Sequence, residues 1–522
     1  MTEALKKKIG QLFMFGFPSK GFTDDFADFC NKYYIGNFTV NANDSATTEG
    51  LCELISKVRK NTYEVTGQYP LVEIDQEGGW VTRFYEGAAM ISGAMSFTAS
   101  GADYDKMYRV GKRVGRILRA VGCTLNDSPV LDVNINPNNP IIGTRSYGET
   151  AQQVIDVAIP YMEGMQSEKV VSVVKHFPGH GNVSGDTHTS IVHNDTDADT
   201  LRKTEYVPFK KAFEKGAGGI MTAHVIHDAF SPLPATTAPE IMTGLLRDEL
   251  GFEGVAITDA MGMRGVENLY PNGKSAVMAL LAGCDVLLYY TYNFDQMQKA
   301  LDAVYAAVES GEITEERIDL SYNRIVALKE KFDFASAEPD LELAKKLIYN
   351  DEEIAENLDD KISSITKIKD DGILSGLSGK KILCVSPVCD AIRGVEEKRR
   401  QILSFAGVFA DNFDNATGVV SSLDGLTPEV ESAINGEYDV AVVGIFDANS
   451  YKGQLDIVKA LRGTGKTVVA VLLRTPYDYR YVKECNAVIT GYEYTTLSAK
   501  AITEAMKKND YRGKMPVTLP EE

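Results

Sequence analysis

The stretch KHFPGHGNVSGDTHTS, residues 175–190, holds the densest set of side chains capable of acid–base chemistry. Within it, Asp186 and His188 are two positions apart, and such residues point to the same side of an extended segment. A carboxylate there can accept the Nδ1–H of the imidazole, which fixes the tautomer and leaves Nε2 for proton transfer. The surrounding glycines and Pro178 are typical of a long loop. The pair therefore fits a proton shuttle, with an Asx-turn beside a surface histidine as the plainer alternative.

A second candidate is Asp259, which ends the apolar run GVAITD at 254–259. A lone acid at the end of a buried strand suits a nucleophile or a metal ligand. The structural alternative is a cap for the helix that follows.

The stretch IDQEGGWVTRF, residues 74–84, adds groups that can bind hydroxyls. Asp75 can accept hydrogen bonds and Arg83 can donate them as a fork, while the sole tryptophan, Trp80, can stack on a ring or simply pack. Arg145 lies in the turn-rich segment NPNNPIIGTRSYG at 136–148.

Short apolar runs hold these residues in place. They lie at 9–17, 35–40, 70–75, 123–133, 169–177, 218–224, 254–259 and 283–290. Helical segments separate them, among them an amphipathic one at 108–122 with arginines on its polar face. Eight β-then-α units predict a TIM barrel, whose chemistry lies at the C-terminal ends of its strands. A doubly wound sheet is the alternative, but a phosphate-binding glycine fingerprint is missing. The polar residues at the predicted strand ends are Asp75, Asp132, Lys175, His176, His224 and Asp259.

The chain changes character after about residue 335. We predict a barrel at 1–335, a charged helical connector at 336–380 and an α/β sandwich domain at 381–522, the last from the runs KILCVS, YDVAVVGIF, TVVAVLLR and NAVITGY. The run at 9–17 is interpreted as a first buried strand rather than a signal peptide.

Four motifs in this order resemble glycoside hydrolase family 3, and specifically its β-N-acetylglucosaminidase branch. They are IDQEGG-x-V-x-R, NP-x-NPIIG-x-RS-[FY]-G, KHFPGHG followed by D-x-H, and ITDAM. The segments SITKIKDDGILSGLSGKKILCV and GKMPVTLP are similar to the second domain of the family. Two positions depart from the branch: Trp80 stands where a basic residue is common, and TDAMGM replaces a paired SDD.

The resemblance implies a role for each matching position. Asp259 would be the nucleophile, and His188, assisted by Asp186, would be the general acid and then the general base. The residues implied to bind the terminal sugar are Asp75, Arg83, Arg145, Lys175 and His176. No cofactor or metal is expected. The implied activity is release of terminal N-acetylglucosamine with retained configuration. The implied substrates are peptidoglycan-derived fragments met during cell-wall recycling.

Several alternatives stay open at this point. Phosphate instead of water would make the enzyme a β-N-acetylglucosaminide phosphorylase, and a β-glucosidase of the same family shares the motifs. All six histidines lie between His176 and His227, which is also a pattern for a metal-dependent hydrolase, although no histidine leaves an early strand. A sugar-binding protein without turnover would not need Asp259, Asp186 and His188 together.

Composition limits the partners. The net charge of -19 disfavours nucleic acid. Seven cysteines, an odd and scattered set without a C-x-x-C pair, disfavour a disulfide framework and a structural zinc site. Because no apolar run approaches ~20 residues, we expect no membrane span and a cytoplasmic protein acting on a small carbohydrate. The oligomeric state is open.

Overall fold

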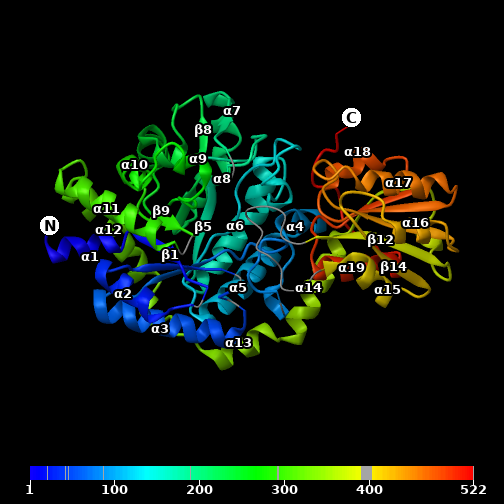
Figure 1. Ribbon diagram of the computed structural model, residues 1–522, viewed down its shortest axis with the longest axis horizontal. Coiled ribbons are helices and arrows are strands. Elements are labelled where there is room, and N and C mark those ends of the chain that lie inside the picture. Colours follow the sequence, from blue (N-terminus) through cyan, green and yellow to red (C-terminus); the bar gives the residue numbers. More distant parts are fainter. Residues whose placement is uncertain are drawn as a thin grey trace.

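A computed structural model of the chain describes residues 1–19, 21–41, 43–44, 46–85, 87–187, 190–290, 293–389 and 403–520. Two bodies of secondary structure follow one another along the chain (Figure 1). The first is built on an eight-stranded sheet and the second on a seven-stranded sheet. The helix α14 (Asp351–Ser364) runs between them.

The first body is a barrel of parallel strands. They are β1 (Phe13–Gly16), β2 (Asn37–Val40), β3 (Leu71–Ile74), β4 (Leu125–Asn126), β5 (Val171–Phe177), β7 (Gly219–Thr222), β9 (Val255–Ile257) and β10 (Leu287–Tyr289). Their order in the sheet is β10-β1-β2-β3-β4-β5-β7-β9, and a parallel bridge between Ile257 and Val286 joins the two ends. Each predicted apolar run contributes one strand, so the TIM-barrel prediction is confirmed.

Helices surround this barrel in the order that β-then-α units require. They are α1 (Glu3–Gly10), α2 (Asp24–Tyr33), α3 (Thr48–Thr66), α4 (Ala94–Ser100), α5 (Tyr104–Val121), α6 (Ala151–Ser167), α7 (Ala198–Lys203), α8 (Tyr206–Glu214), the π-type helix η4 (Glu240–Glu249), α9 (Arg264–Glu267), α10 (Lys274–Ala282), α11 (Phe294–Glu309) and α12 (Glu315–Lys331). Short 3-10 turns are η1 (Gly87–Ala89), η2 (Gly143–Arg145), η3 (Ala235–Thr237) and η5 (Phe334–Ser336). Side chains at the N-termini cap many of these helices and fix where they begin, for instance the Thr150 and Gln153 capping box of α6.

Two local features differ from expectation. The run at 9–17 does contain the predicted buried strand, but β1 begins only at Phe13, because Glu3–Gly10 forms a helix with Leu5 and Ile9 buried. The arginines of 108–122 do not all face solvent. Arg113 is 3% exposed and bonds to Glu356 and Asn357 of α14, a contact that the amphipathic pattern alone does not reveal.

The loop after β5 carries an extra pair of strands that the apolar pattern did not indicate. β6 (Val192–Asn194) pairs in parallel with β8 (Val225–His227) in a two-stranded sheet of its own. Val183, Val192, Ala223 and Val225 form a small buried cluster there. This ribbon supports the end of the loop that follows β5.

The second body is an α/β sandwich. Its strands are β11 (Thr366–Asp370), β12 (Ile382–Cys389), β13 (Leu403–Ser404), β14 (Ala416–Ser421), β15 (Val440–Ile445), β16 (Thr467–Leu472) and β17 (Ala487–Thr490). Five of them are parallel, while β11 and β13 pair antiparallel at the edges. The predicted α/β sandwich fold is therefore confirmed. α13 (Leu341–Ile348) and α14 precede this sheet.

Helices cover both faces of this sheet. They are α15 (Phe405–Asn412), α16 (Pro428–Ile434), α17 (Gln454–Gly463), α18 (Tyr479–Val482) and α19 (Thr496–Lys508), with the turns η6 (Leu374–Gly376) and η7 (Pro476–Asp478). One apolar core contains residues of α15 and α19, and a separate one contains residues of α16 and α17. The sheet thus buries both faces, as a mostly parallel sheet requires.

Buried polar contacts join the two bodies. Glu493, 1% exposed, accepts a hydrogen bond from Gly93 N at 2.6 Å and lies 3.2 Å from Lys361 Nζ of α14. Asn134 Nδ2 donates to the Tyr477 hydroxyl at 2.6 Å. A Cβ at Gly93 would come within 2.9 Å of Glu493 Oε2, so a larger residue there would displace this carboxylate.

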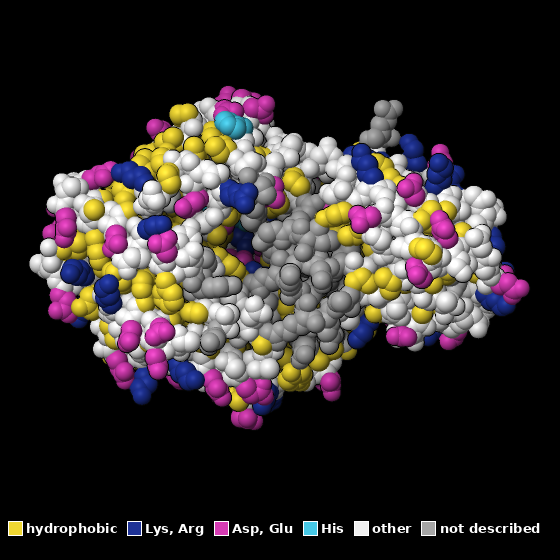
Figure 2. Space-filling view, viewed as in Figure 1, with side chains coloured by type: hydrophobic (Ala, Val, Ile, Leu, Met, Phe, Trp, Pro, Cys, Tyr) yellow, Lys and Arg dark blue, Asp and Glu magenta, His cyan; other side chains and the backbone are white. Residues whose placement is uncertain are grey.

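The visible surface mixes acidic and basic side chains, and it is hollowed near the middle of the molecule (Figure 2). Within the residues that the structure describes, no helix has both the length and the apolar composition needed to cross a membrane.

Candidate active site

A cavity of about 790 Å³, measured out to its open mouth, lies at the C-terminal end of the barrel strands. We call it the barrel cavity. It is lined by Asp75, Glu77, Val81, Arg83, Asp127, Ile141, Arg145, Lys175, His176, His180, Thr187, Met221, Asp259, Ala260, Met263, Leu288 and Tyr290. Six residues singled out from the sequence therefore share this one cavity. They are Asp75, Arg83, Arg145, Lys175, His176 and Asp259.

Asp75 is held by two cations. Its Oδ1 lies 2.6 Å from Lys175 Nζ, and its Oδ2 lies 2.8 Å from Arg83 Nη2. Burial disfavours the charged carboxylate, but Lys175 and Arg83 outweigh it and lower the pKa of Asp75 below its usual value. An ionised Asp75 presents acceptor oxygens beside fixed donors, which is the pattern that recognises vicinal hydroxyls.

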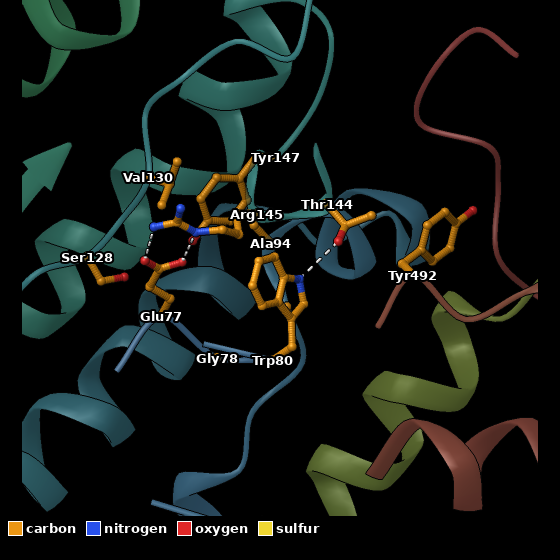
Figure 3. A pocket seen from close by; sticks show the side chains of 11 residues that line it. Glu77, Gly78, Trp80, Ala94, Ser128, Val130, Thr144, Arg145, Tyr147 and Tyr492 are labelled. Atoms are coloured by element: carbon orange, nitrogen blue, oxygen red, sulfur yellow. Dashed lines mark hydrogen bonds and ion pairs between the residues drawn. The ribbon is translucent and has the colours of Figure 1, made fainter. Parts of the chain in front are cut away.

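Glu77 pairs with both Arg145 and Lys175. Arg145 donates to both of its oxygens, from Nη2 at 2.6 Å and from Nε at 2.9 Å, in the fork drawn in Figure 3. Lys175 Nζ lies 2.7 Å from Glu77 Oε1. Burial opposes ionisation, yet Arg145 and Lys175 lower the pKa of Glu77 to about 2. Glu77 thus links Arg145 to Lys175 and, through it, to Asp75.

His176 is oriented by Asp132, which also follows a barrel strand. Its Nδ1 lies 2.7 Å from Asp132 Oδ2, and its backbone N–H donates to the same carboxylate. His180 N donates to Asp132 Oδ1 at 2.7 Å. Asp132 is fully buried, and although burial opposes the charge, His176 keeps its pKa below the usual range. With Nδ1 engaged, Nε2 is the nitrogen of His176 that can bind a ligand.

Asp259 follows β9 and lines the barrel cavity half-buried. Its Oδ1 accepts a hydrogen bond from Ala260 N at 2.7 Å. Ala260 in turn accepts from His224, whose Nε2 lies 3.2 Å from Ala260 O. Asp259 therefore lines the same cavity as Asp75, Lys175 and Arg83.

The loop after β5 reaches the barrel cavity at Thr187. Thr187 Oγ1 lies 3.3 Å from His180 Nε2, which ties this part of the loop to the barrel. Asp186, the residue before it, is half-buried. His188, predicted as the proton shuttle, lies outside the described residues. Thr187, the residue directly before His188, therefore lies at the wall of the cavity.

Comparisons with known proteins agree with this arrangement. Residues 4–328 match the sequence model of the glycosyl hydrolase family 3 N-terminal domain.

The chain belongs to glycoside hydrolase family 3.

Among curated family relatives, β-hexosaminidase A of Pseudoalteromonas piscicida is 27% identical over 510 residues, covering 90% of this chain and 85% of that protein. The β-hexosaminidase of Thioalkalivibrio sulfidiphilus is 38% identical over 243 residues, covering 45% of this chain and 68% of that protein. A solved family 3 β-N-acetylglucosaminidase from Paenibacillus sp. str. FPU-7 superposes with a TM-score of 0.92 at 30% identity over 100% of both chains.

In this family 3 chain, the structure shows the surroundings of four other histidines. His224 is buried, and its Nδ1 lies 2.8 Å from Thr236 Oγ1. His180 lines the barrel cavity. Asp228 pairs with the exposed ring of His193, at 2.8 Å. His227 is buried, and burial lowers its pKa to about 4.

Trp80 does not line the barrel cavity. Its ring lies 4.0 Å from the Arg474 guanidinium of the second body. It also lies 6.0 Å from the Arg145 guanidinium, and Nε1 donates to Thr144 Oγ1 at 3.2 Å (Figure 3). Trp80 therefore packs where the two bodies meet, and its departure from the branch pattern falls beside the site rather than within it.

Sequence reasoning missed Glu77, Glu73 and Asp127 as individual residues. Glu77 stands two positions after Asp75, a spacing that could have indicated a second acid on the same side. Glu73, Asp75 and Asp127 each place one oxygen within 4.8 Å of the others, which is the arrangement among the described residues best suited to a cation or a shared proton. Neither Glu73 nor Asp127 belonged to a recognisable motif.

Proposed function

We propose that this protein is a retaining exo-β-N-acetylglucosaminidase in which Asp259 is the nucleophile. The observation that carries the proposal is the position of Asp259 in the same cavity as the five hydroxyl-binding candidates. Support for the amino sugar comes from the family 3 β-N-acetylglucosaminidase of Paenibacillus, which is similar over the whole chain. The curated relatives named β-hexosaminidases support the same substrate class.

The proposed sugar ligands are Asp75, Arg83, Arg145, Lys175 and His176. Asp75 pairs with Arg83 and Lys175, while Glu77 holds Arg145 and Asp132 holds His176, so these groups are fixed before any ligand arrives and binding does not have to order them. A recess at the end of a barrel, walled by such groups, suits the terminal residue of a chain. This supports release of single sugars rather than cleavage within a polymer.

The proposed reaction has two displacement steps. In the first, an Asp259 oxygen attacks the anomeric carbon while the bond to the leaving oxygen breaks, and His188 gives its proton to that oxygen. In the second, His188 takes a proton from water, whose oxygen displaces Asp259 and restores the original configuration. Asp186 is proposed to hold the His188 ring. The entry of Thr187 into the cavity wall supports delivery of the neighbouring His188 to the same place.

We further propose that the natural substrates are peptidoglycan-derived fragments met in the cytoplasm during wall recycling. Six described cysteines, each buried, carry free thiols, which suits a reducing compartment. The acceptor is proposed to be water. The lysine and both arginines of the cavity are already paired with carboxylates, so a phosphate ion would have to compete with Asp75 or Glu77 for them.

The test compares hydrolysis of an aryl β-N-acetylglucosaminide with that of the matching aryl β-glucoside, each with and without phosphate. We expect the amino sugar to be preferred and free N-acetylglucosamine to be released in both buffers. Formation of sugar 1-phosphate would replace the hydrolase proposal by a phosphorylase. Preference for the glucoside would assign a β-glucosidase instead.

The roles of Asp259 and His188 are tested by substitution. Asp259→Asn should lower kcat by at least about a thousandfold without changing the unfolding temperature, because the nucleophile is lost and the fold is not. His188→Ala should slow a natural disaccharide far more than an aryl glycoside whose leaving group needs no proton. Equal losses on both substrates would rule out His188 as the general acid.

A further inference from the structure

Three carboxyl groups meet where β3 and β4 run side by side. Glu73, Asp75 and Asp127 each have an oxygen within 4.8 Å of the other two. Asp127 lines the barrel cavity, whereas Glu73 lies in β3 outside its lining. Both are 1% exposed. Glu73 and Asp127, called the pair below, are therefore buried directly beside Asp75 of the proposed sugar-binding cluster.

The partners of these three acids differ sharply. Asp75 has Lys175 and Arg83 on its two oxygens. Both oxygens of Glu73 and Oδ1 of Asp127 are buried, and no described residue meets hydrogen-bond geometry with them, although Thr39 is near enough to Glu73 to lower its pKa. Buried acceptors are normally satisfied, and an unsatisfied one costs about 1–3 kcal/mol. A proton on one of the two carboxyl groups would supply the missing donor to the other.

Charge leads to the same conclusion. Lys175, Arg83 and Arg145 are matched by Asp75, Glu77 and Asp259 in the same cavity, so Glu73 and Asp127 are in excess. The groups facing the pair are Thr39 of β2, Asp75 directly after β3 and Lys175 of β5, and Cys123 lies near Glu73. Burial, and after it Asp75, raises the pKa of Glu73 to about 7. Burial and Glu73 raise the pKa of Asp127.

We propose that Glu73 and Asp127 are positioning residues of the sugar site that share one proton, and that this proton keeps Lys175 in its bonds to Asp75 and Glu77. Loss of the proton adds a second negative charge beside Asp75, and that charge attracts the Lys175 ammonium away from Glu77. Sugar binding then weakens while the chemistry at Asp259 is unchanged. The inference concerns the binding site of the proposed glycosidase and rests on that function.

The kinetic test is the pH dependence of KM for an aryl β-N-acetylglucosaminide. In the wild type we expect KM to rise by about tenfold from pH 6 to pH 9, which corresponds to one pKa unit of coupling. Asp127→Asn and Glu73→Gln each keep one negative charge and a hydrogen-bond donor in the pair but remove the titration. In both, the ratio of KM at pH 9 to KM at pH 6 should fall to about 1–2, and the pH profile of kcat should stay that of the wild type.

Asp478→Asn is the matched control, because Asp478 is a buried carboxyl of the second body whose pKa burial also raises to about 7. This variant should keep the wild-type KM ratio. A ratio unchanged in Asp127→Asn and Glu73→Gln would overturn the proposal. Loss of wild-type activity with a chelator would overturn it as well, because the three acids would then hold a divalent cation instead of a proton.

Thermal unfolding gives a readout that does not depend on activity. A carboxyl whose pKa is higher in the folded chain than in the unfolded chain stabilises the fold at acidic pH, and this stability is lost as pH rises through the folded pKa. The wild-type unfolding temperature should therefore fall more between pH 5 and pH 8 than that of Asp127→Asn. Parallel curves would contradict the shared proton. If the wild type fails to hydrolyse the aryl substrate, the proposed function fails, and this comparison still decides the proton.

Discussion

Glu77 decides how the cations proposed to bind the sugar are arranged. It accepts two hydrogen bonds from Arg145 and one from Lys175, while Lys175 continues to Asp75. The side chain is 6% exposed, so its charge depends on these partners rather than on water. The Glu77 carboxylate thus links Arg145 to Lys175 and, through Lys175, to Asp75.

Glu77→Gln is predicted to damage both binding and stability. The neutral amide leaves Arg145 and Lys175 buried with less compensating charge, a change that typically costs about 3–5 kcal/mol. We expect a KM at least tenfold higher and a lower unfolding temperature. The matched control is Glu338→Gln, which removes the exposed partner of Arg59. A wild-type KM in the Glu77 variant would contradict the role assigned here.

The pH dependence of this stability has a definite sign. The pKa of Glu77 is about 2 in the folded chain, against about 4.3 for a free glutamate. Its ionised form therefore stabilises the fold above pH ~4, and that contribution, about 3 kcal/mol, is lost as pH falls toward 2. In chemical denaturation, the difference between wild type and Glu77→Gln should narrow over this range. A constant difference would show that the shift in the pKa of Glu77 does not contribute.

At the scale of elements, the barrel strands were predictable and their shared polar contacts were not. Each apolar run marks a strand because burial on both faces demands continuous hydrophobic residues. Polar residues near the end of a strand or just after it then fall at one end of the barrel, which is why Asp75, Lys175 and Asp259 were found. Glu73 sits within a strand, so its pairing with Asp127 depends on the register of β3 with β4. No pattern along the chain specifies that register.

The helix–strand boundary at the N-terminus shows the same limit. Lys6, Lys7 and Lys8 are compatible with a solvent-facing helix or with the flank of a strand. Burial of Leu5 and Ile9, four residues apart, settles the helix, because this spacing places both on one helical face. Only tertiary packing distinguishes the two.

The loop after β5 has one glycine that its neighbours require. A Cβ at Gly181 would lie 1.7 Å from the backbone oxygen of Val133, so the loop cannot keep its path with any larger residue. Asn139 also binds this segment through the carbonyls of His180 and Gly181. The position of the loop's later residues at the cavity depends on this contact.

Gly181→Ala is predicted to displace the loop after β5. We expect kcat/KM to fall by at least tenfold and the unfolding temperature to drop by about 2–4 °C, as for an overpacking cost of about 1–3 kcal/mol. Gly376→Ala serves as the control, because its Cβ would meet nothing within 4 Å. If both variants keep wild-type kinetics, the loop does not need the close approach to Val133.

At the scale of the whole molecule, the contact between the two bodies is polar and buried. Lys361 of α14 is fully buried, donates to Ser96 Oγ at 2.6 Å and lies beside Glu493 of the second body. Burial lowers the pKa of Lys361, so its charge relies on Glu493. This pair, together with Gly93, ties barrel, connector helix and sandwich at one point.

Glu493→Gln should loosen this junction. It leaves the Lys361 ammonium buried without a carboxylate, which we expect to cost about 3–5 kcal/mol. Calorimetry should show a lower first transition that separates from the second. Asp359→Asn breaks only the exposed pair with Arg512 and should shift the transition little. Equal effects of the two substitutions would show that the Glu493 contact does not couple the bodies.

The contact of Glu493 with Gly93 also sets an order of events during synthesis. The residues assigned to the sugar and to catalysis lie between positions 75 and 259, so they leave the ribosome early. Yet a Cβ at Gly79 would lie 2.8 Å from Gly93 Cα, so the segment after Glu77 rests against the backbone that Glu493 fixes. That support arrives only once residue 493 has been translated. A nascent chain stalled before this point carries every group proposed for catalysis but lacks the Glu493 contact that supports the segment after Glu77. The timing of translation therefore decides when the site is complete.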